Sequence, residues 1–202
     1  MKIHKLDGYI QNNYLVEYPD KLLLFDSGTK GDVDSFINFI QIKLKRNLSD
    51  LKIVFISHMH PDHSGGAMLL KKKTGCKLAA PKNLDQWYGG LSGSVEKSVD
   101  ILLTYYVASR KNKDLKKNIF FSKNLKIDYL LEHNESLPFF SDWKAIKAPG
   151  HTDCDMNLLC EEKKLIYVAD NIIRTNRGYI TPYPMFDPKN YYNNLKFYET
   201  LK

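Results

Sequence analysis

Hydrophobic residues follow two periodic patterns along residues 1–80. Short apolar runs bounded by polar or turn residues predict strands, and apolar residues three or four positions apart predict helices. The strand pattern covers 13–18, 22–26, 53–57 and 77–80, and the helical pattern covers 31–46 and 67–70. Pro19 and Asp20 are turn residues that join the first two strands as a hairpin. The predicted order is hairpin, helix, strand, helix, strand.

The segment 83–126 differs in character from the sequence on either side. Its apolar residues recur at helical spacing and predict a helix with one apolar face, formed by Val95, Val99, Leu102, Leu103, Tyr106 and Val107. A basic run follows at 110–117. We predict a helical insertion or cap within one domain of residues 1–202. Two interpretations are open, a lid that shapes a substrate pocket or adds positive potential, and a packed helix with a solvated face.

Strand patterns return in the second half of the chain. They cover 127–131, 143–147, 156–160 and 165–169. Asp187 and Pro188 are typical of the cap and first residue of a helix, so a helix is predicted to follow them. The alternation of strands and helices predicts a mixed α and β architecture.

Four candidate metal ligands come directly after the predicted strand 53–57. They are His58, His60, Asp62 and His63. Residues two apart in an extended chain point the same way, so His58 and His60 can reach one ion. Pro61 favours an extended His60 and then a turn, which lets Asp62 and His63 face a different point. A single histidine is more often a core or surface residue, but four ligands at this spacing favour a metal site.

Two further polar positions also follow predicted strands. Pro149-Gly150-His151-Thr152 comes after 143–147, and Asp170 comes after 165–169. Strand ends are where a sheet presents side chains along one edge. We therefore group His151 and Asp170 with the histidine motif.

This ordered series resembles the motifs of the metallo-β-lactamase superfamily of metal-dependent hydrolases. The segment Leu24-Phe25-Asp26-Ser27-Gly28 is similar to the strand and turn that precede the first metal motif of that family. The resemblance covers most of the chain outside 83–126. It implies an α+β fold, an αββα sandwich of two face-to-face mixed sheets with helices on the outer faces. The metal site is then expected at one sheet edge.

The resemblance also implies a role for each candidate ligand. His58, His60 and His151 would hold one metal ion, Asp62 and His63 would bind a second, and Asp170 would bridge the two. Imidazole suits zinc, and a carboxylate makes the second site tolerant of zinc, iron or manganese. Water on such ions loses a proton near neutral pH, so it can attack an electrophile as hydroxide. Asp62 and Asp170 are the catalytic candidates, and Asp62 would orient or deprotonate the water.

The predicted function is hydrolysis of a small ester, thioester or lactone, as in the glyoxalase II and lactonase-like members. Arg174, Tyr179 and Tyr183 lie in the predicted loop after Asp170 and are candidate substrate contacts, or residues that pack on the cap. The alternatives are a phosphodiesterase or nuclease, and a redox or non-catalytic metal-binding member.

The histidine content departs from the family pattern. The family's final metal-binding histidine follows its C-terminal helix, whereas none of the six histidines here lies beyond Asp170. We therefore expect either two ions or a single ion with an incomplete second site. Three explanations are open: the domain lacks its C-terminal strand, the second site is weakened, or a partner chain completes it.

Composition limits the expected kind of substrate and the expected cellular location. Hydrophobic residues make up 43% and charged residues 26% of the chain, which is ordinary for a globular domain. The net charge of +7 comes from scattered lysines, so a small-molecule substrate is favoured over nucleic acid. The sequence shows no signal peptide or membrane span, and its odd cysteine number argues against a disulfide framework. A cytoplasmic location is expected, and homo-oligomerisation is left open.

Overall fold

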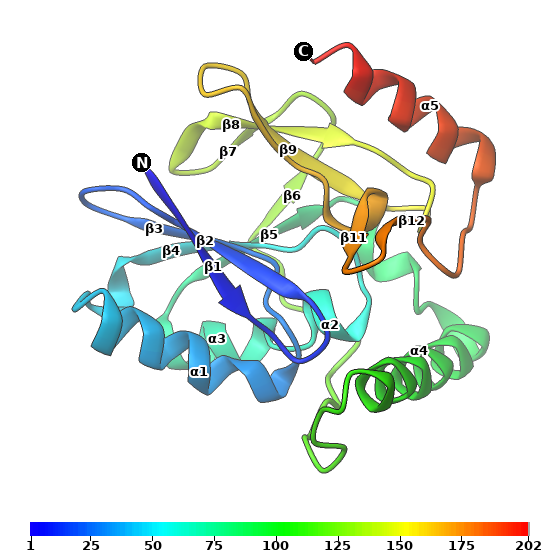
Figure 1. Ribbon diagram of the computed structural model, residues 1–202. Coiled ribbons are helices and arrows are strands. Elements are labelled where there is room, and N and C mark those ends of the chain that lie inside the picture. Colours follow the sequence, from blue (N-terminus) through cyan, green and yellow to red (C-terminus); the bar gives the residue numbers. More distant parts are fainter. Residues whose placement is uncertain (202) are drawn as a thin grey trace.

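The computed structural model describes residues 1–201, apart from the side chain of Asp85. Two β-sheets lie face to face, with helices on both outer faces (Figure 1). Helices α1 (Val33–Asn38) and α3 (Ala67–Thr74) cover the first sheet, and α5 (Pro188–Glu199) lies over the second (Figure 1). This arrangement confirms the αββα sandwich implied by the sequence resemblance.

The first sheet has six strands in the order β1-β2-β3-β4-β5-β6. Its strands are β1 (Lys2–Asp7), β2 (Asn12–Glu17), β3 (Leu22–Phe25), β4 (Leu51–Phe55), β5 (Lys77–Pro81) and β6 (Tyr129–Leu131). The sheet is mixed, because β1 to β3 pair antiparallel and β3 to β6 pair parallel. Strand β1 was not predicted, since its large apolar residues, Ile3 and Leu6, do not alternate with polar ones.

The second sheet has the order β10-β9-β8-β7, and all its strands pair antiparallel. Its strands are β7 (Ser136–Leu137), β8 (Phe140–Lys147), β9 (Met156–Cys160) and β10 (Leu165–Tyr167). A separate hairpin of β11 (Ile173–Thr175) and β12 (Gly178–Ile180) occupies the segment that we predicted to be a loop. Its short strands are mostly exposed, which explains why they lack a clear apolar pattern.

The hydrophobic core has two layers, one between the sheets and one beneath the helices. Ile53 and Phe55 of β4 pack between the sheets, while Val54 packs beneath the helices. In the inter-sheet layer the rings of Phe25 and Trp143 lie edge to face, with centroids 4.9 Å apart. Strand β4 is buried on both faces of the sheet, which requires a continuous apolar run. Residues 53–55 form that run.

The predicted helix 31–46 is broken into three pieces. α1 is preceded by a 3-10 turn at Lys30–Asp32 and followed by a π-helical turn at Phe39–Lys43. The remaining short helical elements are α2 (Pro61–Ser64) and the 3-10 turns Leu48–Asp50, Leu84–Gln86 and Ala169–Asn171. Across residues 1–201, no helix combines the length and the apolar character needed to cross a bilayer.

The long helix α4 (Gly90–Arg110) lies in the predicted insertion, beside the sandwich (Figure 1). The helix was predicted, but the interpretation in which its apolar face packs on the domain is wrong. Val95, Val99, Leu102 and Tyr106 are exposed, because the buried side of α4 carries other residues. That side contains Gly93, Ile101, Thr104 and Ala108, and the apolar members pack against Tyr9 and Ile119. Periodicity identified the helix but not the side that faces the domain.

Candidate metal centre

The histidine motif lies where β4 leaves the sheet and α2 begins. His60 caps α2 with an extended backbone, φ −60° and ψ 153°, and Pro61 is its first residue. Pro61 lacks an N–H, which costs nothing in the first turn of a helix, where that group has no partner. Gly66 allows the chain to pass close to a neighbouring turn, because a Cβ there would lie 2.5 Å from the Ser27 carbonyl oxygen. The local backbone therefore matches the prediction from Pro61.

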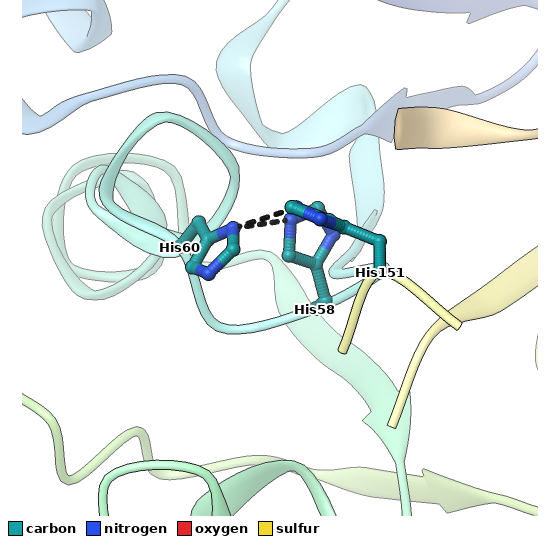
Figure 2. A group of neighbouring side chains, drawn as sticks. All are labelled: His58, His60 and His151. Carbon is teal, nitrogen blue, oxygen red and sulfur yellow. Dashed lines mark hydrogen bonds between the residues drawn. The ribbon is translucent and has the colours of Figure 1, made fainter. Parts of the chain in front are cut away.

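Three imidazoles converge on one point (Figure 2). His60 Nδ1 lies 3.1 Å from His58 Nε2 and 2.9 Å from His151 Nε2. All three side chains are buried. Zinc–nitrogen bonds of about 2.0–2.1 Å in a tetrahedron place neighbouring nitrogens about 3.3 Å apart, close to the observed spacing. The donor atoms, their number and their spacing therefore fit a zinc-sized ion.

A second group of donors lies beside the first. His63 Nε2 is 3.3 Å from Asp170 Oδ1 and 3.6 Å from Asp62 Oδ2. This nitrogen is buried and has no hydrogen-bond partner in the described structure. The other oxygen of Asp170, Oδ2, lies 3.5 Å from His151 Nε2. An unpartnered buried nitrogen facing two carboxylates fits a cation, and Asp170 faces both groups as a bridging carboxylate would.

Hydrogen bonds to the outer ring nitrogens orient three of these histidines. His63 Nδ1 donates to Asp26 Oδ2 at 2.7 Å, and His151 Nδ1 donates to the Pro184 carbonyl oxygen at 2.7 Å. His58 Nδ1 lies 3.0 Å from Ser57 Oγ. Partners of this kind fix the tautomer, so the opposite nitrogen presents a lone pair to a metal.

Asp26 is a buried residue whose role sequence reasoning missed. Its carboxylate accepts hydrogen bonds from the Ser57 backbone N–H and hydroxyl, at 2.7 and 2.8 Å, as well as from His63. The Tyr167 hydroxyl donates to the same carboxylate. The sequence does place this carboxylate directly after the apolar strand 22–25, where it is expected to be buried. A buried carboxylate needs several hydrogen-bond donors, so its position could have indicated a supporting role.

Burial and neighbouring charges shift the pKa values of the clustered histidines in different directions. Burial, with the neighbouring histidines, lowers the pKa of His58 and His60 well below the usual value, which keeps these imidazoles neutral. Burial acts to lower the pKa of His63, but the negative charges of Asp170, Asp62 and Asp26 outweigh this effect. Together they raise the pKa of His63 well above its usual value.

The two carboxylates shift in opposite directions. Burial raises the pKa of Asp62 to about 6, although His63 opposes the shift. Burial also acts to raise the pKa of Asp170, but the adjacent His63 and His151 lower it below its ordinary value. Asp170 is therefore the carboxylate that stays ionised, and Asp62 is the one that can take up a proton near neutral pH.

The predicted substrate contacts lie outside these donor groups. Arg174 stacks over the Tyr179 ring, with its guanidinium carbon 6.0 Å from the ring centroid. Tyr179 is 71% exposed and Tyr183 85% exposed, so neither is held in a buried pocket. Tyr183 is nevertheless tied to the metal edge through its neighbour Pro184, which binds His151.

The other two histidines are separate from the site. His4 pairs with Glu17 Oε2 at 2.7 Å, and His133 accepts a hydrogen bond from the Lys147 backbone N–H. Within residues 1–201, the second donor group consists of His63 and Asp170, with His58 of the first group within 4.8 Å of both and Asp62 Oδ2 facing His63 Nε2, and it includes no histidine from outside the two groups.

Comparisons with known proteins agree with this geometry. The family model described as the metallo-beta-lactamase superfamily matches residues 6–202. Among solved structures, the family protein TTHA1429 from Thermus thermophilus is 17% identical with a TM-score of 0.69, over 98% of this chain and 70% of that one. TTHA1623 in a di-iron-bound form is 18% identical with a TM-score of 0.66, over 100% of this chain and 87% of that one.

A third structural match is BJP-1, a subclass B3 metallo-beta-lactamase of Bradyrhizobium japonicum. It is 18% identical with a TM-score of 0.52, over 83% of this chain. The match spans 53% of BJP-1, so this chain corresponds to about half of that protein. These identities support a shared fold, while the family model covers nearly the whole sequence. The chain therefore belongs to the metallo-beta-lactamase superfamily.

Proposed function

We propose that this protein is a metal-dependent hydrolase of a small ester, thioester or lactone. The observation that carries the proposal is the convergence of three buried ring nitrogens, with His58 Nε2 and His151 Nε2 at 3.1 and 2.9 Å from His60 Nδ1, and Asp170 Oδ2 3.5 Å from His151 Nε2. A serine or cysteine nucleophile is not needed in such a site. The free cysteines are all buried, and none belongs to the donor groups.

His58, His60 and His151 would hold a metal ion, which would supply a coordinated water with a pKa of about 7 and polarisation of a substrate oxygen. The protein's own groups would control position and proton transfer. Asp170 supplies negative charge to both donor groups, because its two oxygens face His63 and His151. Asp62, with its pKa raised to about 6 by burial, is suited to orient the water and exchange a proton near neutral pH.

The second donor group supports a second ion. His63 Nε2, Asp62 and Asp170 provide one nitrogen and two carboxylates, a set that accepts zinc, iron or manganese. TTHA1623, which shares the fold, was crystallised with two irons, so iron belongs among the candidates. Arg174 of β11 is the proposed contact for an anionic group of the substrate, with Tyr179 opposite it on β12 and Tyr183 in the segment that follows the hairpin as further candidates.

The test combines metal analysis with hydrolysis assays. Protein purified without added metal should contain at least one equivalent of zinc, iron or manganese, and should hydrolyse members of a thioester and lactone panel. His58→Ala should abolish the activity and lower the metal content. His4→Ala is the matched control, because His4 is paired with Glu17 away from both donor groups. Less than one equivalent of metal, or activity that survives His58→Ala, would refute the proposal.

A phosphodiesterase activity is the second candidate. The segment 110–117 carries Arg110, Lys111, Lys113, Lys116 and Lys117 at the end of α4 and beyond it. A nucleic-acid substrate bound by these residues would lose affinity steeply as salt rises. Hydrolysis of a phosphodiester with a flat salt response would argue against nucleic acid as that substrate.

A further inference from the structure

His60 is the one clustered histidine whose outer ring nitrogen lacks a hydrogen bond. His58, His63 and His151 each have a partner for Nδ1. For His60 the inner atom is Nδ1 and the outer atom is Nε2, which is buried and unpartnered in the described structure. When Nδ1 of a neutral imidazole binds a metal, its single proton is on Nε2, and a buried N–H needs an acceptor.

The side chain that faces this nitrogen comes from the inserted helix α4. Asp100 Oδ2 lies 3.6 Å from His60 Nε2. Among the described side chains, Asp100 is the carboxylate that lies within 4.0 Å of this nitrogen. The Tyr88 hydroxyl donates to Asp100 Oδ2 at 2.7 Å, and the Trp87 ring packs edge to face on His60 with centroids 5.9 Å apart. Asp100 is therefore held in place beside His60.

We propose that Asp100 is a positioning residue for His60. It accepts the Nε2 proton and thereby holds Nδ1 towards the metal. The distance of 3.6 Å exceeds a charge-assisted hydrogen bond of about 2.7–2.9 Å by less than 1 Å, so a small side-chain movement closes it. This inference rests on the proposed metal site, and it makes the inserted helix part of the support of that site.

The role also explains the unusual orientation of α4. The apolar residues Val95, Val99, Leu102 and Tyr106 face outward, although burial would favour the opposite orientation. Asp100 lies instead on the inward side, next to the buried Ile101 and Thr104. A carboxylate that serves His60 gives a reason for this side of the helix to face the domain.

The test measures metal affinity in place of turnover. Zinc dissociation constants from chelator competition should rise about 10- to 100-fold in Asp100→Ala, the usual range for loss of a partner to a metal-binding histidine. Asp100→Asn keeps an acceptor oxygen without the charge, so it should show a smaller rise. Glu96→Gln is the matched control, because Glu96 is an exposed carboxylate one turn away on α4. It should stay within about twofold of the wild type.

A double-variant cycle separates positioning from a general structural effect. In a His60→Ala background, Asp100→Ala should cause no further loss of zinc affinity, because the group it acts through is gone. The absorption spectrum of the cobalt-substituted protein should change in Asp100→Ala and not in Glu96→Gln. Tyr88→Phe should reproduce part of the affinity loss, because Tyr88 donates to Asp100.

Each outcome has a defined meaning. Zinc affinity within twofold of wild type in both Asp100 variants overturns the inference alone, provided that the wild type binds zinc. An equal loss of affinity in the His60→Ala background also overturns it, because Asp100 would then act on the fold in general. A wild-type protein that binds no zinc, iron or manganese overturns the proposed function and this inference with it.

Discussion

Replacing Asp26 by Asn should weaken binding of the second metal ion while leaving the first site unchanged. Oδ1 of Asp26 accepts from the Ser57 backbone N–H, and an Asn oxygen can do the same. Oδ2 accepts from the Ser57 hydroxyl, His63 Nδ1 and the Tyr167 hydroxyl, and an amide NH₂ would face these donors instead. The amide would favour the His63 tautomer with its proton on Nε2. That proton would occupy the nitrogen that faces Asp62 and Asp170.

The size of the effect follows from the bonds that are lost. Each hydrogen bond to a charged group contributes about 1.5–3 kcal/mol, and Ser57 and His63 can reverse their roles and recover part of it. We therefore expect metal-free Asp26→Asn to lose about 2–4 kcal/mol of unfolding free energy. The second ion should bind about 10- to 100-fold more weakly.

Isothermal titration with zinc of the metal-free protein measures both sites. The wild type should show two binding events, and Asp26→Asn should keep the event assigned to His58, His60 and His151. Asp32→Asn is the matched control, because Asp32 is a buried carboxylate bonded to Thr29 and Lys117. It should lose stability without losing an ion. Two events of unchanged affinity in Asp26→Asn would show that Asp26 does not control the His63 tautomer.

Two further predictions concern stability. Zinc at 100 times its dissociation constant should stabilise the protein by about 2.7 kcal/mol. In a thermal melt, this should raise Tm by about 5–10 °C over a chelator-treated sample. An equal rise in His58→Ala would contradict the prediction. Burial raises the pKa of Asp155 from 3.8 to about 6, so this group favours the folded state at low pH, and its contribution is lost as pH rises through about 6. One unit of pKa shift corresponds to about 1.36 kcal/mol, so the metal-free wild type should lose about 3 kcal/mol of unfolding free energy relative to Asp155→Asn between about pH 3.5 and 6.5. Denaturant melts across this pH range measure the loss. Parallel pH profiles of the two proteins would contradict the prediction.

Much of the sandwich could be predicted from local patterns. Strands β3, β4, β5 and β9 are buried on both faces, so their sequences are nearly continuous apolar runs that stand out from the rest. The edge strand β1 and the exposed hairpin of β11 and β12 carry no such pattern. They form because a neighbouring strand offers hydrogen bonds, and that information is not local.

The candidate metal ligands could also be found in the sequence, because several of them are crowded together. His58, His60, Asp62 and His63 lie within six positions, and the strand-end rule added His151 and Asp170. Their supporting residues could not be found this way. Asp26 and Asp100 are single carboxylates far along the chain from the histidines that they face, and no spacing connects them.

The sequence by itself thus determined most of the buried strands, the main helices and the candidate donor residues of the site, while the layered sandwich followed from the family resemblance. The elements and donors depend on local spacing, on the burial of each strand and on the chemistry of imidazole and carboxylate. Only the tertiary structure decided which side of α4 faces the domain and which partner each histidine has. The apolar periodicity of α4 pointed to the wrong side, because helix orientation depends on every contact across the interface. The placement of Asp100 beside the buried His60 was likewise decided only by the tertiary structure.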